Sequence, residues 1–159
     1  MSESSKRASK KQQILDAAMK VFAEKGFYNA KVSDIARAAG VAHGTVYLYF
    51  ENKETILLQI FEEKMEELLI YVREEIQRES GAEGKLRRLI EIQMNLIETN
   101  PELTELLLLE ARQSGKFLRS TAIDKIACYC HLIQEVLREG VEEGLIRPDL
   151  DVSVVATML

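Results

Sequence analysis

Apolar residues recur at three- and four-residue intervals along almost the whole chain, which is the period of one face of an α-helix. In the first third of the chain this pattern predicts three helices, over residues 12–25, 32–39 and 43–50. Gly26 and Gly40 follow the first two, and glycine is typical of the position just after a helix. The chain is therefore expected to begin with a group of short helices.

The helical period continues through the rest of the sequence. A long helix is expected over 52–78, followed by a break at 80–84, and Asp151 is well placed to cap a last helix. Three further helices are expected between them, over 85–98, 101–114 and 118–140. Because no strand-like alternation appears, the predicted fold class is all-α, with three short N-terminal helices joined by a long fourth helix to a larger helical domain.

Composition and length agree with a helix-rich globular protein. The 159 residues are 47% hydrophobic and 30% charged, with only 8 Gly and 2 Pro. The first residues have no apolar core of a signal peptide, and no apolar run is long enough to span a bilayer. Cys128 and Cys130 point to different sides of a helix and cannot readily pair, as expected of thiols in a reducing compartment. We therefore expect a cytoplasmic protein without a membrane partner.

The net charge of −5 is unevenly divided along the chain. Residues 1–60 hold nine Lys and Arg against six Asp and Glu, a balance of +3, which leaves −8 for the other 99 residues. A polyanion would be attracted to the N-terminal part and repelled by the rest. Residues 1–11 are polar, rich in Ser and Lys and without period, and they predict a flexible basic arm.

Residues 32–49 have the pattern of a helix-turn-helix. Such a unit needs a small residue where its two helices touch and a glycine that can adopt positive φ in the turn. Ala36 and Gly40 stand at these two positions. The apolar residues that would lock the two helices together are Ile35, Ala39, Val41 and Val46.

The segment from Ile35 to Glu54, IARAAGVAHGTVYLYFENKE, resembles the signature of the TetR/AcrR family of transcriptional regulators. The resemblance implies a helix-turn-helix DNA-binding domain over residues 12–51 and a helical ligand-binding and dimerisation domain over 52–159. It also implies a homodimer that binds a palindromic duplex operator. Family members usually complete an eighth helix and add a ninth to form the dimer interface, and the last predicted helix is still incomplete at Leu159.

The resemblance also assigns DNA contacts by position. His43, Gly44, Thr45 and Tyr47 are expected to face bases or the adjacent backbone in the major groove. Tyr49 and Lys53 are expected to meet phosphates, with packing of Tyr49 against the first helix as the alternative. The family commonly has two threonines where this chain has Ala30 and Lys31, and Lys31 with Ser33 is expected to replace their phosphate contact.

For the second domain the sequence predicts an apolar pocket among the helices. Its candidate lining residues, which would otherwise simply fill the core, are Met94, Ile97, Leu103, Leu107, Ile123 and Ile126. Residues 42–57 and 110–114 also resemble the acyl-CoA-responsive TetR-type regulators of fatty-acid degradation. That resemblance implies that Arg112, Lys116 or Arg119 meets the CoA phosphates, whereas a structural salt bridge is the alternative for Arg112.

There are three alternatives to an acyl-CoA-responsive repressor. An enzyme is disfavoured, because the chain has only two histidines, no metal-ligand cluster, no glycine-rich phosphate loop and no nucleophile motif. We therefore expect no metal and no cofactor. A TetR-type repressor that responds to another hydrophobic molecule, such as a drug or efflux substrate, and a ligand-independent DNA-binding dimer both stay open.

Overall fold

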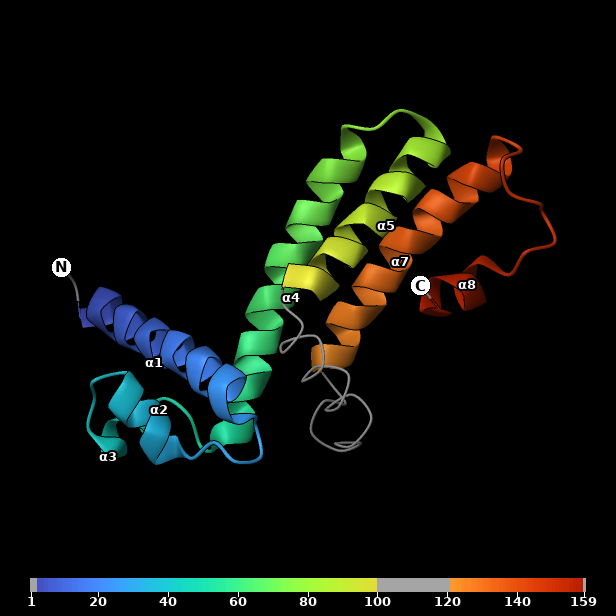
Figure 1. Cartoon of the computed structure of the whole chain (residues 1–159). Helices are drawn as coiled ribbons and strands as arrows, with labels where there is room; N and C mark the ends of the chain where they lie inside the picture. The colour runs from blue at the N-terminus through green and yellow to red at the C-terminus, as the bar shows by residue number, and fades with distance from the viewer. Residues whose placement is uncertain (1–2, 100–120, 159) are drawn as a thin grey trace. The chain divides into compact units, whose positions relative to one another are not determined.

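The computed structural model of the protein describes residues 3–99 and 121–158, and every regular element within these ranges is an α-helix (Figure 1). In chain order the helices are α1 (Glu3–Lys25), α2 (Val32–Ala38), α3 (His43–Val46), α4 (Lys53–Gln77), α5 (Gly81–Thr99), α7 (Thr121–Glu142) and α8 (Val152–Met158). The described residues divide into two compact units, with the boundary after Glu62 within α4. The predicted helix over 101–114 lies outside the described residues.

The first unit, residues 3–62, is built around the apolar faces of α1, α2 and the start of α4. Ile14, Ile35 and Ile56, one from each of these helices, are completely buried. The helix α3 adds Val46, which is 1% exposed. This core fixes α2 and α3 against the much longer α1.

The second unit contains the rest of α4 together with α5, α7 and α8, and it has a core of its own. Val72 of α4, Leu89 of α5 and Ile133 of α7 are at most 1% exposed. Ala156 of α8 is buried in the same core. Within the described residues, no helix combines the length and apolar character needed to cross a membrane.

The first helix starts earlier than its sequence pattern indicates. The predicted start at residue 12 is wrong, because α1 begins at Glu3, so residues 3–11 are helical rather than an irregular arm. The stretch lacks glycine and proline, and its Glu, Lys, Arg and Ala residues form helix readily. The ammonium of Lys11 also donates a 3.1 Å hydrogen bond to Gln59 Oε1 of α4, a contact 48 residues away along the chain.

Two other helix boundaries differ from the prediction. The helix α5 begins at Gly81 rather than residue 85, because the Glu143 carboxylate accepts a 3.0 Å hydrogen bond from the Ala82 backbone N–H. The helix α3 ends at Val46, although hydrogen bonds from the N–H groups of residues 48–50 to Thr45 and Val46 continue the coil to Phe50. At the other end of the chain, the predicted cap is confirmed: Asp151 Oδ1 accepts from the Ser153 N–H at 3.0 Å.

Candidate nucleic-acid interface

The turn between α2 and α3 is tight and is closed by main-chain bonds. Gly40 has a φ of +63°, a left-handed conformation that a residue with a Cβ rarely adopts. The N–H of Val41 donates to the carbonyl of Ala36 at 3.0 Å, so the chain reverses directly after α2. Ala36 and Ala39 are both buried, which lets the two helices approach closely. The predicted helix-turn-helix is thus present.

The segment that follows has one apolar face and one exposed polar face. Val46 and Phe50 point into the core of the first unit, at 1% and 4% exposure. His43 and Tyr47 are exposed, and their rings meet edge to face with centroids 5.2 Å apart. Gly44 between them is exposed and Thr45 is half-buried. Four of the predicted DNA-contacting residues therefore lie on one small helical turn, with its apolar side anchored behind them.

The start of α2 is held by Asp34. Its Oδ2 accepts from the backbone N–H of Lys31 at 3.3 Å and pairs with the Lys25 ammonium at 3.1 Å. The hydrogen bond from Lys25 lowers the pKa of the Asp34 carboxyl, against the opposite effect of desolvation. Asp34 is therefore ionised at neutral pH, and the side chains of Lys31 and Ser33 remain exposed beside it.

The Lys53 side chain, predicted to meet a phosphate, makes contacts within the first unit. Its ammonium donates to three backbone carbonyls between α1 and α2, those of Phe27, Tyr28 and Ala30, at 2.8, 3.1 and 3.3 Å. The same nitrogen lies 4.6 Å from the centre of the Phe27 ring. An ammonium has three N–H donors, so these three carbonyls can engage all of them in the protein without DNA. Lys53 thereby ties the start of α4 to the loop between α1 and α2.

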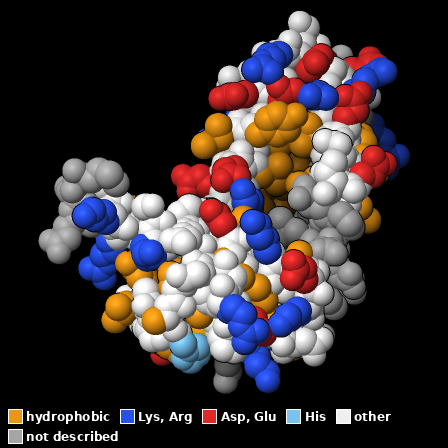
Figure 2. Space-filling view, turned by 60° about the vertical axis from the view of Figure 1, so that its left-hand side comes forward, with side chains coloured by type: hydrophobic (Ala, Val, Ile, Leu, Met, Phe, Trp, Pro, Cys, Tyr) orange, Lys and Arg blue, Asp and Glu red, His pale blue; other side chains and the backbone are white. Residues whose placement is uncertain are grey.

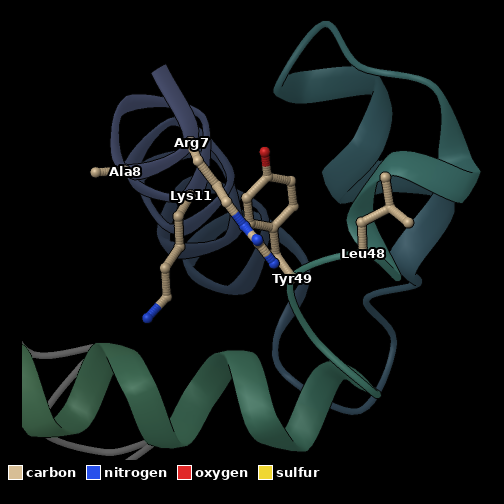
Figure 3. Close-up of a pocket in the computed structure, with 5 residues that line it drawn as sticks. All are labelled: Arg7, Ala8, Lys11, Leu48 and Tyr49. Atoms are coloured by element: carbon tan, nitrogen blue, oxygen red, sulfur yellow. The ribbon is translucent and has the colours of Figure 1, made fainter. Parts of the chain in front are cut away.

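Tyr49 packs against the core rather than standing clear of it. Its half-buried ring contacts the core of the first unit, and the Arg7 guanidinium lies 6.0 Å from the ring centre. Arg7, Ala8, Lys11, Leu48 and Tyr49 line a shallow surface pocket between α1 and the segment after α3 (Figure 3). The position of the Tyr49 ring therefore agrees with packing against the first helix, which was the alternative to a phosphate contact.

Three of the predicted ligand-lining side chains lie in the described part of the second unit. Met94 and Ile97 of α5 are 54% and 49% exposed, and Ile126 of α7 is 40% exposed, so these residues lie outside the core that the described residues form. Ile90 of α5 is exposed in the same way, which gives α5 an apolar stripe at positions i, i+4 and i+7. The predicted ligand-binding residues outside the described part are Leu103, Leu107, Arg112, Lys116, Arg119 and the side chain of Ile123.

The first unit and the second unit each match a family model. Residues 14–60 match the bacterial regulatory proteins of the tetR family, and residues 61–159 match the C-terminal region of YsiA-like proteins. The chain belongs to the TetR family of bacterial transcriptional regulators. Its relatives are regulators of transcription, which agrees with the prediction of a DNA-binding protein rather than an enzyme.

Individual relatives cover most of the chain. A fatty acid metabolism regulator protein of Bacillus subtilis is 39% identical over 147 residues, which are 92% of this chain and 76% of the relative. A crystal structure of the regulator FadR from Bacillus subtilis in complex with stearoyl-CoA superposes with a TM-score of 0.81 at 39% identity, covering 92% of this chain and 79% of that one. The transcriptional repressor KstR2 of Mycobacterium tuberculosis is 28% identical over 148 residues, 92% of this chain and 74% of the relative. The TetR-type fold therefore extends over both units.

The carbonyl contacts of Lys53 predict a loss of stability rather than a loss of DNA affinity on substitution. Lys53→Met is expected to lower the free energy of unfolding by about 1.5–3 kcal/mol, since it removes hydrogen bonds from a charged donor. The matched substitution Lys20→Met, at an exposed position of α1, should change it by less than about 0.5 kcal/mol. Urea unfolding followed by circular dichroism measures both. Two results together would contradict this role. The Lys53→Met protein would have unchanged stability, and the salt dependence of its binding to random-sequence duplex would fall by the amount expected for one lost phosphate contact.

Proposed function

We propose that this TetR-family protein is a cytoplasmic repressor of fatty-acid metabolism genes that binds a palindromic operator as a dimer and is released by a long-chain acyl-CoA. The observation that supports it most strongly is the 39% identity, over 92% of this chain, to a regulator whose structure holds stearoyl-CoA. The relative KstR2 is named a repressor, which supports repression over activation.

The exposed face of residues 43–47 is the surface that enters the major groove. His43 offers a hydrogen-bond donor or acceptor to a base edge, and the hydroxyls of Thr45 and Tyr47 can bond a base or a phosphate. Gly44 leaves room for the DNA backbone to approach, since nothing lies within 4 Å of where a Cβ would stand. Lys31 and Ser33 at the start of α2 are exposed donors suited to a neighbouring phosphate. Tyr49 contributes at most its hydroxyl, because its ring is engaged by the core and by Arg7.

An exposed apolar stripe in the second unit supports an acyl chain as the ligand. The stripe of Ile90, Met94 and Ile97 on α5 is apolar and exposed, and Ile126 of α7 is a further exposed apolar side chain. Burial of each methylene of an acyl chain is worth about 0.8 kcal/mol, so affinity should rise with chain length. Arg112, Lys116 and Arg119 are the candidates to bind the phosphates of CoA, because guanidinium and ammonium groups pair well with phosphate.

The coupling between ligand and DNA is assigned to α4. This helix is continuous from Lys53 to Gln77, and Lys53 bonds to the loop between α1 and α2 while Val72 lies in the core of the second unit. We call residues 43–47 the recognition segment. A tilt of α4 on ligand binding would change the distance between the two recognition segments of a dimer. Release by a factor of one hundred requires about 2.7 kcal/mol of coupling free energy.

Loss of a hydroxyl from the exposed face should weaken specific DNA binding. We expect Tyr47→Phe and Thr45→Ala each to weaken binding to the preferred duplex by about 1–3 kcal/mol. The preferred duplex is first selected from a pool of randomised duplexes by the purified protein, and affinity is then measured by fluorescence anisotropy. Tyr71→Phe, which removes an exposed hydroxyl from the second unit, is the control and should leave the affinity unchanged. Equal affinities for all four proteins would exclude this face as the reading surface.

Ligand and DNA should oppose each other's binding by the same factor. Stearoyl-CoA is titrated into the protein with and without the selected duplex, and the duplex is titrated with and without stearoyl-CoA. We expect the duplex to raise the Kd for stearoyl-CoA by the same factor by which stearoyl-CoA raises the Kd for the duplex. Free CoA, which lacks the acyl chain, is the control and should bind far more weakly. If stearoyl-CoA binds equally in both series, it is not the releasing ligand. If it does not bind while the duplex does, the ligand assignment alone fails and the DNA-binding role stands.

A further inference from the structure

The first turns of α1 carry four cations close together on the helix surface. Lys6 and Lys10 are four residues apart, and so are Arg7 and Lys11, so each pair lies on neighbouring turns. None of the four forms an ion pair with an acidic side chain in the described part of the chain. We refer to Lys6, Arg7, Lys10 and Lys11 as the α1 basic band.

The α1 basic band is unfavourable for the isolated protein. Like charges at i and i+4 destabilise a helix, and cations near a helix N-terminus oppose the helix dipole. A neighbouring polyanion would remove both penalties. Figure 2 also shows Lys and Arg side chains gathered on one face of the first unit.

Contacts within the first unit hold part of this band beside the recognition segment. The Arg7 guanidinium lies 6.0 Å from the Tyr49 ring centre, and the Lys11 ammonium lies 5.8 Å from that of Phe50. Figure 3 shows the Arg7 side chain across the Tyr49 ring and the Lys11 side chain directed toward α4. Leu48, which lines the same pocket, is adjacent to Tyr47 in the chain and is 72% exposed. Arg7 and Lys11 are therefore held next to the segment that directly follows residues 43–47.

We propose that the α1 basic band binds backbone phosphates of duplex DNA beside the base pairs faced by α3, with Arg7 and Lys11 as its principal contacts. Arg7 suits this role because a guanidinium can stack on an aromatic ring and still donate to a phosphate. Such contacts add affinity without sequence information. This inference goes beyond the proposed function, since it concerns a surface outside the helix-turn-helix and holds whatever ligand the second unit binds.

The test compares the salt dependence of DNA binding in two double variants of equal charge. Arg7→Gln/Lys11→Gln alters the band, and Lys20→Gln/Arg73→Gln removes two exposed cations elsewhere. Affinity is measured by fluorescence anisotropy at several salt concentrations, on the selected duplex and on a random-sequence duplex of the same length. For the band variant, the slope of log K against log salt should fall by about 0.9 for each lost phosphate contact, equally on both duplexes. The control should retain the slope of the unmodified protein.

Two further measurements separate this role from a structural one. The charge-preserving variant Arg7→Lys/Lys11→Arg should recover the slope, and the band variant should keep its helix content and melting temperature in the absence of DNA. The proposal is overturned if the band variant and the control have the same slope. It is also overturned if the band variant loses affinity only for the selected duplex, because that result would assign Arg7 and Lys11 to base reading.

Discussion

The position of the recognition segment depends on the burial of Val46 and Phe50. A helix of four residues has too few internal hydrogen bonds to be stable alone, so α3 cannot hold its own geometry. Val46 and Phe50 insert into the core formed by α1, α2 and the start of α4. Burial of two side chains of this size contributes about 1.5–3 kcal/mol each. Residues 43, 44, 45 and 47 are consequently presented by the whole first unit.

The same core determines where the charged groups of the first unit lie. Lys53 bonds to carbonyls of the loop between α1 and α2, and Asp34 ties the start of α2 to Lys25 at the end of α1. Arg7 and Lys11 rest against Tyr49 and Phe50 at the other end of α1. The Lys and Arg residues of the first unit therefore fall into two groups. Some stabilise the structure through internal contacts, and others remain available to bind a polyanion.

Much of the fold could be predicted from the sequence because helical period is a local property. The order of the described helices and the turn at Gly40 follow from the spacing of apolar residues and glycines. The early start of α5 could not be predicted, because its cap comes from Glu143, 61 residues further along the chain. The role of Lys53 was hidden for the same reason: its carbonyl partners lie 23 to 26 residues away and become neighbours only after folding. The exposure of Met94 and Ile97 likewise depends on packing that the period alone does not reveal.

In the proposed function, two copies of the first unit bind DNA together, each through its residues 43–47. Hydroxyl-radical footprinting of the selected duplex measures this directly. We expect two protected half-sites related by two-fold symmetry and separated by one helical turn of DNA, about 34–36 Å, or a multiple of it. Protection of a single half-site with full affinity would contradict it, because one recognition segment would then be sufficient.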